Sequence, residues 1–354
     1  MRDKPSINKR QKKIWFLLSV LAFLTLTPLI LLYTGGYRFS DNWSLAKTGG
    51  IYIYSPISGS EIFLNNVFQK QTNILQSGVF IQNLKPKTYS TLVAKEGYWP
   101  WQKQLTVEQQ LVTEARAFLI PQSPRGKTLL RGPLISIYAP ANDLLIFEEI
   151  KNRTKKIVFY LPNSGEFLTN FSPDTTQILS SAPQINSVYS ADNIIYVKRG
   201  QKTIKAEIDL SANTVKASYG AIPDNLTTDE KTLNTPAQFI KYDPRNDLRI
   251  WKTDANEIWA EWINKNSPLP YYMRNEKEVI LQTKNKIKNL DFFPYRRDVI
   301  IFAAGNEISA MEIDGRGGRN IQPIYKGKNP NFAVFPSQKI IYILDDGALS
   351  QIEL

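Results

Sequence analysis

Residues 239–251 read FIKYDPRNDLRIW, and this stretch decides the fold because the chain repeats its plan. An apolar run reaches an aromatic residue, a short polar turn follows, and a second apolar run begins. The key aromatic residues of neighbouring copies are 51, 53, 51 and 42 residues apart. Repeats of about 40–50 residues with several strands each are typical of β-propeller blades, so the last 230 or so residues predict roughly five blades. The other copies lie at 135–147, 188–197, 290–302 and 332–342.

The chain is therefore expected to be mainly β, with a propeller-like domain over 134–354. One or two β-sandwiches that share this hairpin chemistry are the alternative. Phe171-Ser-Pro-Asp174 falls outside the regular spacing. It resembles the aromatic-Ser-Pro-Asp turn of TolB-like and WD40-like propellers, and the resemblance is limited to that repeated turn.

Near the N-terminus, residues 14–33 read IWFLLSVLAFLTLTPLILLY, and no charge occurs between Lys13 and Arg38. Twenty helical residues span about 30 Å, the hydrocarbon thickness of a bilayer. The stretch predicts a transmembrane helix whose partner is the lipid bilayer. A cleaved signal peptide is the alternative, but such peptides have an apolar core of about 7–15 residues and a small-residue cleavage site.

Charges on either side of the apolar stretch predict its orientation. The far side carries only Arg38 and Lys47 in its first 20 residues. The positive-inside rule thus predicts a single-pass protein of the cytoplasmic membrane with a cytoplasmic tail at 1–13 and the rest of the chain outside. The basic residues of the tail are Arg2, Lys4, Lys9, Arg10, Lys12 and Lys13.

Composition narrows the function further. The formal net charge is +12, but outside the tail only 38 basic residues face 31 acidic ones, so no basic stripe for nucleic acid is expected. The chain has no cysteine and no histidine. Thiolate nucleophiles, disulfides, Ser-His-Asp triads and imidazole metal ligands are therefore excluded, and no cofactor is expected.

A second β-rich region follows a polar spacer at 34–48. Alternating runs bounded by Pro, Gly and Asn predict short strands and a small β-sandwich over 49–120. A proline- and glycine-containing stretch, 121–133, is expected to be a linker. The runs are 51–54, 61–64, 89–94, 102–107 and 112–120.

This region, from Gly49 to about Leu119, resembles the PEGA domain. Ser60, Asn66 and Lys87 depart from the family's preferred residues, and the small-turn-then-proline piece is reduced to 71–73. The resemblance implies an extracytoplasmic accessory module without catalytic residues. The matching pieces are Ser55-Pro56 with Gly59-Ser60, 61–66, 83–89 and 95–101.

Several side-chain groups are candidate sites. Tyr98, Trp99 and Trp101 suit a carbohydrate-stacking platform, or they cap the core of the small β-domain. The sequence Asp314-Gly-Arg-Gly-Gly-Arg319 suggests a phosphate loop, but no helix follows, so a hairpin turn is favoured. Two carboxylate pairs, Glu148 with Glu149 and Glu312 with Asp314, are candidates for glycosidase chemistry, and Asp254-Ala-Asn256-Glu257 is a calcium loop or a turn. The aromatic residues Trp251, Trp259, Trp262, Tyr271 and Tyr272 belong to an interface or to the core. Sequons for glycosylation occur at Asn42, Asn152 and Asn225.

No catalytic, cofactor-binding or metal-binding residue is assigned. The sequence predicts a non-catalytic, membrane-anchored extracytoplasmic envelope protein whose head binds a cell-wall polymer or another envelope protein. A carboxylate-dependent polysaccharide-processing enzyme and a structural spacer without a specific ligand are the alternatives.

Overall fold

The structure is a computed structural model that describes residues 9–39, 45–141, 143–151, 154–181, 183–226, 237–335 and 338–353. The sequons at Asn42 and Asn152, like Arg2 and Lys4 of the tail, lie outside these ranges. Two compact units are present, Met1–Lys95 with Pro100–Leu119, and Glu96–Trp99 with Ile120–Leu354.

The first unit begins with helix α1 (Lys9–Thr34), which contains the predicted transmembrane segment. It is long and apolar enough to cross a membrane, with a mean hydropathy of 2.4 over its best window, and none of its residues is buried. Pro28 lies within the helix. A short hairpin, β1 (Tyr37–Phe39) with β2 (Leu45–Lys47), follows.

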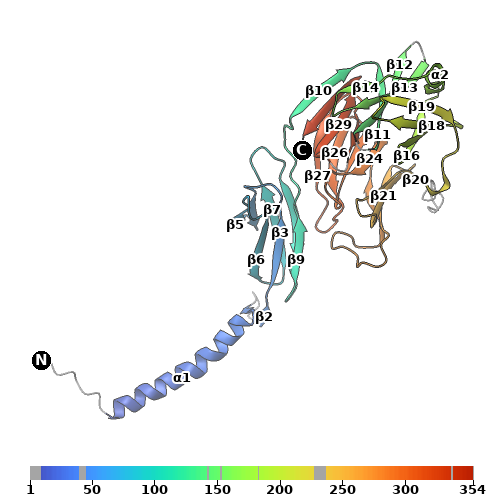
Figure 1. Cartoon of the computed structure of the whole chain (residues 1–354). Coiled ribbons are helices and arrows are strands. Elements are labelled where there is room, and N and C mark those ends of the chain that lie inside the picture. Colours follow the sequence, from blue (N-terminus) through green and yellow to red (C-terminus); the bar gives the residue numbers. More distant parts are fainter. Residues whose placement is uncertain are drawn as a thin grey trace. The chain divides into compact units, whose positions relative to one another are not determined.

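Seven further strands form two sheets that we call the small β-unit (Figure 1). Each predicted run contains a strand, although the run 112–120 is a strand only from Val112 to Arg116, and β5 and β6 were not predicted. Inward residues alternate with outward ones along β8, where Trp101, Lys103 and Leu105 are buried. The three-stranded sheet has the order β6 (Gly78–Leu84), β3 (Gly49–Tyr54), β9 (Val112–Arg116), and the four-stranded sheet β5 (Val67–Gln71), β4 (Glu61–Leu64), β7 (Thr88–Ala94), β8 (Trp101–Thr106).

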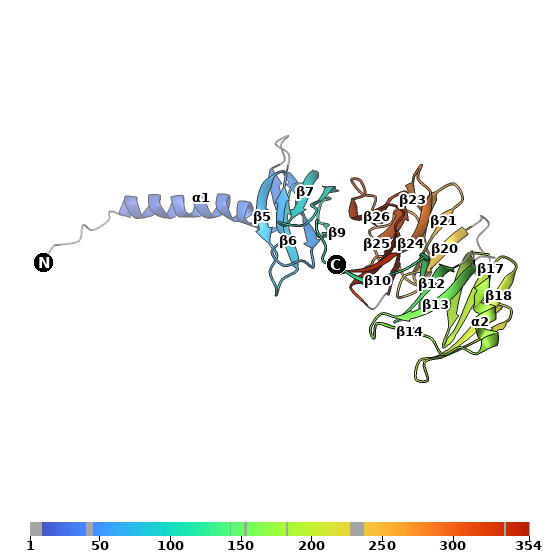
Figure 2. The same cartoon turned by 90° about the horizontal axis from the view of Figure 1, so that it is seen from above.

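The second unit, called the head, is built of five consecutive antiparallel sheets, which we number as blades 1 to 5 (Figure 2). Each predicted repeat is the first hairpin of one blade. Blade 1 contains β11 (Leu134–Ala141), β12 (Leu144–Lys151), β13 (Thr154–Leu161) and β14 (Glu166–Leu168), with β15 (Ser180–Ser181) beside β13; blade 2 contains β16 (Ile185–Ala191), β17 (Ile194–Arg199), β18 (Lys202–Asp209) and β19 (Thr214–Tyr219). Blade 3 contains β20 (Ala237–Tyr242), β21 (Leu248–Thr253), β22 (Glu257–Trp262) and β23 (Lys277–Gln282); blade 4 contains β24 (Ile287–Phe292), β25 (Val299–Ala304), β26 (Glu307–Glu312) and β27 (Ile321–Lys326).

Blade 5 joins the two ends of the head. Its order is β10 (Gly126–Arg131), β30 (Ala348–Glu353), β29 (Ile340–Asp345), β28 (Asn331–Val334), so a strand that precedes blade 1 completes the last blade. Gly126 pairs with Ile352 and Lys127 with Gln351. The stretch 121–133, expected to be a linker, therefore contains a strand of the head.

The first strands are in contact for four of the five pairs of neighbouring blades among the described residues. β11 contacts both β16 and β28, and β24 contacts both β20 and β28. Apolar clusters fill the spaces between blades 1 and 2, 3 and 4, and 1 and 5. This strand order and these clusters make the head a five-bladed propeller-type fold, as the repeats predicted.

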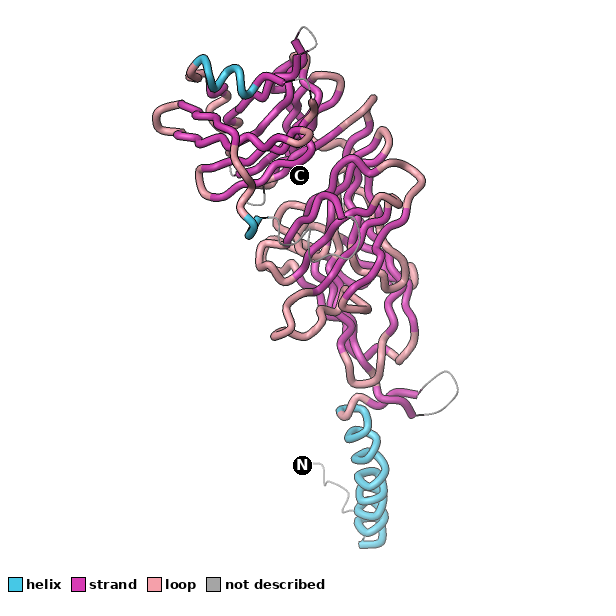
Figure 3. The backbone as a smooth tube through the Cα atoms, turned by 90° about the vertical axis from the view of Figure 1, so that its right-hand side faces the viewer, coloured by secondary structure: helices cyan, strands magenta, loops and turns pink. Residues whose placement is uncertain are grey.

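Helices are scarce in the head, as Figure 3 shows. The predicted aromatic-Ser-Pro-Asp turn at Phe171 is instead the start of helix α2 (Pro173–Leu179). The Ser172 hydroxyl accepts a hydrogen bond from the Thr175 N–H, and proline occupies the first helical position. This is the ordinary chemistry of a helix N-cap, which explains why the same residues begin a helix.

Candidate functional site

Four loops of blades 3 and 4 lie at one edge of their sheets, and we call them the rim. They connect first to second and third to fourth strands, and such turns of an antiparallel sheet fall at the same edge. Seven basic and five acidic residues occur in these loops. The rim loops are 243–247, 263–276, 293–298 and 313–320.

A buried aspartate organises the first rim loop. The Oδ1 atom of Asp243 accepts hydrogen bonds from the N–H groups of Asp247 (2.7 Å) and Leu248 (2.9 Å). Only 1% of Asp243 is exposed. Its second oxygen contacts Arg297 of blade 4, so one carboxylate both closes its own turn and ties two blades together.

Arg297 also binds the second aspartate of that loop. Its Nη2 lies 2.5 Å from Oδ2 of Asp247, whose other oxygen accepts a hydrogen bond from Asn264 at 2.6 Å. The Asn264 hydrogen bond, followed by the Arg297 interactions, holds the pKa of Asp247 below its usual value. The Arg297 guanidinium therefore contacts both aspartate side chains of this loop.

A neighbouring arginine forms a separate pair. Arg296 makes two hydrogen bonds to Asp298, Nε to Oδ1 at 2.7 Å and Nη2 to Oδ2 at 2.8 Å. Burial by itself would lower the pKa of Arg296, but the charge and hydrogen bonds of Asp298, together with Tyr271 and Glu312, outweigh it and raise that pKa. Parallel two-bond pairing of this kind fixes a guanidinium in one orientation.

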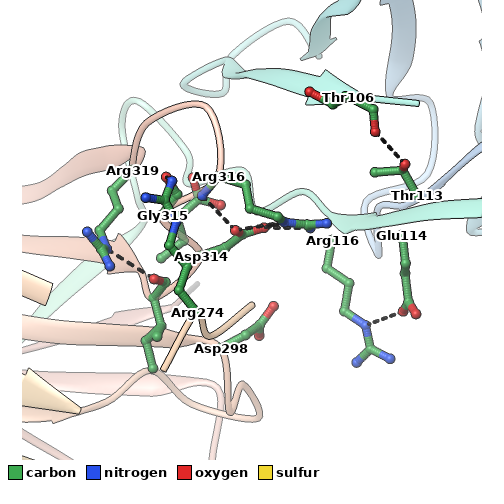
Figure 4. Close-up of polar contacts among 12 residues, drawn as sticks. Thr106, Thr113, Glu114, Arg116, Arg274, Asp298, Asp314, Gly315, Arg316 and Arg319 are labelled. Carbon is green, nitrogen blue, oxygen red and sulfur yellow. Dashed lines mark hydrogen bonds and ion pairs between the residues drawn. The ribbon is translucent and has the colours of Figure 1, made fainter. Parts of the chain in front are cut away.

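The turn at 313–320 is held by arginines that bind inside the rim (Figure 4). Asp314 accepts hydrogen bonds from the Arg316 N–H at 2.9 Å and from Arg316 Nη2 at 2.8 Å. The Arg316 guanidinium lies 4.7 Å from the ring centroid of Tyr271, and Arg274 Nη2 donates to the Gly315 carbonyl at 2.9 Å. The turn joins β26 to β27 as a hairpin connection, and no helix follows it.

The last arginine of this turn is partly withdrawn from solvent. Arg319 Nε donates to the Ile313 carbonyl at 3.0 Å, and its Nη2 lies 3.5 Å from Glu278. Burial lowers the pKa of Arg319 from its usual value, and the Glu278 charge opposes this. Glu312 is buried and binds the side chain and N–H of Asn320.

The charged side chains of the rim differ in exposure. The aspartates 243, 298 and 314 are 1%, 7% and 5% exposed. Arg245 and Arg274 are exposed, and Tyr295 is 57% exposed. Three of the five rim carboxylates are thus buried, whereas Asp247 is half-buried and Glu276 is exposed.

The remaining carboxylates considered from the sequence do not make a facing catalytic pair. Glu148 is fully buried between blades 1 and 2, where it lies 3.0 Å from Arg199 Nη2 and accepts hydrogen bonds from Ser136 and the Ile185 N–H. Glu149 is half-buried. Burial, followed by the Glu148 charge, raises the pKa of Tyr138 to about 12.

The predicted aromatic groups divide between core and surface. Trp251 is fully buried and stacks on Trp259 with ring centroids 6.1 Å apart, while Lys277 Nζ lies 5.1 Å from the Trp251 centroid. Tyr272 belongs to the core between blades 3 and 4, and Trp262 and Tyr271 pack against it.

The platform expected from Tyr98, Trp99 and Trp101 is not a single surface. Trp101 is fully buried in the small β-unit. Tyr98 and Trp99 belong to the other unit, where the Trp99 N–H donates to the Ile120 carbonyl at 2.8 Å and Tyr98 pairs with Pro121.

Two further motifs are also ordinary local structure. Asp254, Asn256 and Glu257 form the turn from β21 to β22, in which Asn256 has a φ of 56°. Within the described residues, no cluster of three or more acidic side chains suited to a metal ion occurs. Asn225 is exposed.

Sequence reasoning missed the pairs that cross between blades. A signal was available, because an aspartate directly precedes the second strand of the hairpin at Asp143, Asp247 and Asp298. Nothing in the sequence shows that Arg297 reaches the aspartates of the preceding repeat about 50 residues earlier.

Comparison with known proteins gives structural neighbours only. No family model matches the chain, and no curated protein matches it. Among solved structures, an Hsv2 chain with loop 6CD replaced by a Gly-Ser linker has 7% identity and a TM-score of 0.32, covering 84% of this chain and 89% of that one. A gluconolactonase from Xanthomonas campestris has 10% identity and a TM-score of 0.30, covering 75% and 82%.

A luciferin-regenerating enzyme has 9% identity and a TM-score of 0.35, covering 66% of this chain and 96% of that one. All three neighbours are β-propeller proteins. The assignment of the head to this architecture rests on its strand order and blade closure.

Proposed function

We propose that the chain is a single-pass, membrane-anchored binding or scaffold protein whose head lies outside the cytoplasmic membrane. Helix α1 carries this proposal, because its apolar side chains from 14 to 33 have no buried contact within the described chain. Such a surface is unfavourable in water and favourable in hydrocarbon. The small β-unit, with its resemblance to PEGA domains, acts as the spacer between anchor and head.

The orientation follows from the flanking charges. Six basic residues precede the apolar stretch, which favours a cytoplasmic N-terminus. The test is protease treatment of intact cells that express the chain with a C-terminal tag. Loss of the tag before cell lysis supports the proposal, and a tag protected until lysis refutes it.

The rim is the binding surface that we propose for the head. Three of its five carboxylates are buried, and Arg245, Arg274 and Tyr295 are exposed. Guanidinium groups held in place lose little freedom when they bind, which favours carboxylate or phosphate partners. The partner class is therefore an anionic envelope polymer or an acidic surface of an envelope protein.

Binding can be measured with the full chain in detergent and two probes, dextran sulfate and neutral dextran. The variant Arg245→Gln/Arg274→Gln removes two exposed rim charges and should weaken dextran sulfate binding about tenfold, or about 1.4 kcal/mol. The control Lys198→Gln/Lys216→Gln removes two exposed charges from blade 2. Equal weakening by both variants would show that net charge, and not the rim, attracts the probe.

A further inference from the structure

We propose that the end of α1 and the hairpin after it bind the phosphate groups of membrane lipids through Arg38 and Lys47. The proposal rests on the anchor role proposed for α1. These two are the only basic residues in the twenty that follow the apolar stretch. α1 ends at Thr34, and the hairpin starts at Tyr37 (Figure 1). Because the apolar stretch already spans the hydrocarbon layer, groups fixed at its end lie at the depth of the lipid headgroups.

The hairpin is tied to the end of the helix by backbone hydrogen bonds. Gly36, with a φ of 79°, donates its N–H to the Tyr33 carbonyl at 3.2 Å. A glycine in the left-handed region commonly ends a helix in this way. The Gly36 carbonyl accepts hydrogen bonds from the N–H of Thr48 at 2.8 Å and from its hydroxyl at 2.9 Å. Both ends of the segment that contains the hairpin are therefore held beside the end of α1.

Arg38 is positioned there by uncharged groups. Its Nη1 donates to the carbonyls of Tyr33 (2.9 Å) and Tyr37 (2.8 Å), and its Nη2 donates to Asn83 Oδ1 (3.2 Å). The guanidinium also lies 3.7 Å from the ring centroid of Tyr33. None of these partners carries a charge, and within the described residues Arg38 forms no ion pair. The contacts therefore fix the guanidinium without neutralising it.

Lys47 adds a second cation on the other face of the hairpin. It pairs with Tyr37 across the two strands, and its Nζ lies 5.4 Å from the ring centroid of that tyrosine. Since neighbouring residues of a strand point to opposite faces, Lys47 and Arg38 lie on opposite sides of the hairpin. Cations on both faces suit a layer of many phosphates better than a single bound ion.

The side chains around these cations suit the boundary between headgroups and acyl chains. Tyr33 is 64% exposed, and Leu45 of β2 is 49% exposed. Tyrosine is enriched at membrane interfaces, and long basic side chains place their charge there. A guanidinium held in one orientation matches phosphate oxygens well. An acidic protein surface is a poorer occupant, because the site directly adjoins the stretch that enters hydrocarbon.

Another arginine of the small β-unit provides a matched comparison. The Arg116 guanidinium lies 6.0 Å from the ring centroid of Tyr54, but it also binds Glu114 at 3.3 Å (Figure 4). Arg116 pairs with Tyr54 at the end of β3, whereas the chain enters β3 from the helix at Gly49. This arginine thus has a similar aromatic contact, a carboxylate partner and a place at the far end of the strand.

Lipid binding can be measured on the full chain in neutral detergent by native mass spectrometry. The two probes are phosphatidylglycerol and galactosyl diacylglycerol with the same acyl chains. We expect at least fivefold tighter binding of phosphatidylglycerol. Arg38→Gln/Lys47→Gln should abolish this preference, and the control Arg116→Gln/Lys202→Gln should keep it. Lys202 of blade 2 also lies over a tyrosine, 5.2 Å from the ring centroid of Tyr219.

Equal binding of the two lipids by the unmodified chain overturns the proposal, and so does an equal loss of preference in both double variants. Inorganic phosphate at matched ionic strength should not displace phosphatidylglycerol. Displacement would identify a site for free phosphate and refute a lipid site. A chain that stays in solution without detergent and binds neither lipid refutes the membrane anchor itself, so the two failures are distinguishable.

Thermal unfolding separates lipid binding from a purely structural role of Arg38 at the helix end. The midpoint of Arg38→Gln should fall further below that of the unmodified chain in phosphatidylglycerol than in galactosyl diacylglycerol, because only the first lipid stabilises through this side chain. An equal fall in both lipids would show that Arg38 only caps the helix, and it would refute the proposal.

Discussion

Two sets of arginine–carboxylate ion pairs link neighbouring blades, and they differ in how much solvent reaches them. Between blades 1 and 2, Arg199 and Glu148 are 2% and 0% exposed. Between blades 3 and 4, the Arg297 side chain is 25% exposed and binds Asp243 and Asp247. The first pair is closed off from solvent, and the second lies at the edge of the head.

The difference shows what each pair can do. All partners of the Glu148 carboxylate are internal, namely Ser136, the Ile185 N–H and Arg199. Removing one partner leaves an uncompensated buried charge, which costs far more than the pair itself contributes. At the rim, solvent can replace part of a lost interaction, so the same arginine chemistry can hold loops and still face a ligand.

The largest effect is expected from breaking the buried pair. Glu148→Gln should lower the free energy of unfolding of the head by about 3–5 kcal/mol, because Arg199 keeps its charge without a counter-ion. Denaturant unfolding followed by tryptophan fluorescence measures this. Glu149→Gln is the matched control and should change stability by less than about 0.5 kcal/mol. Similar losses for both variants would contradict the structural role of the pair.

A double substitution sharpens that result. Replacing both partners, as in Glu148→Met/Arg199→Met, should restore most of the lost stability, because no buried charge remains. If the double variant is as unstable as Glu148→Gln, the loss comes from packing at this position.

A smaller effect is expected at the rim. Arg297→Ala should cost about 2 kcal/mol, since Asp243 is buried but the arginine is partly screened by solvent. Arg245→Ala, an exposed arginine in the neighbouring loop, is the control and should be nearly neutral. An effect as large as that of Glu148→Gln would remove the distinction between the two sets of ion pairs.

The smallest effect on stability is expected at Asp345, a carboxylate that is held by hydrogen bonds and not by an arginine. Burial alone would raise the pKa of Asp345, but the N–H groups of Asn329 and Lys328 and the Tyr325 hydroxyl outweigh it and leave that pKa below 3.8. The carboxylate therefore adds stability above its usual pKa, and this contribution is lost as the pH falls through the lower, folded-state value.

Asp345→Asn should be less stable than the unmodified chain by about 1–2 kcal/mol at pH 7, and the gap should close below about pH 4. The thermal midpoint measured from pH 7 to pH 3 checks this. Asp346→Asn, an exposed neighbour in the same turn, should show no such pH dependence. A gap that stays constant to pH 3 would show that Asp345 does not act through its charge.

The sequence predicted the blades well because each first hairpin is a local pattern. Residues such as Tyr242 and Leu248 lie on either side of a turn closed within one repeat. The alternating runs likewise located five strands of the small β-unit. The resemblance to PEGA domains is not shown, because no family model matches the chain. β5 was missed because it does not alternate between buried and exposed residues.

What could not be predicted depends on distant partners. Arg199 lies 51 residues from Glu148, and Gln322 accepts a hydrogen bond from the Ile120 N–H across 202 residues. The sequence at 126–131 does not contain the repeated hairpin pattern, because this strand pairs with residues 348–352 and not with a neighbouring strand in the sequence. The candidate sites could not be judged from the sequence for the same reason, because the residues that pair with each charged side chain lie far away in the sequence.

The closing strand β10 has a mechanical consequence. Beyond Ile120, the first strand of a blade that tension along the chain would meet is β10, whose Gly126 pairs with Ile352 and whose neighbour Arg125 binds Glu353. Residues 352 and 353 thus hold a strand that lies more than 220 residues earlier in the chain. Removal of residues 348–353 would remove the strand that pairs with β10, while the other four blades would keep all their strands.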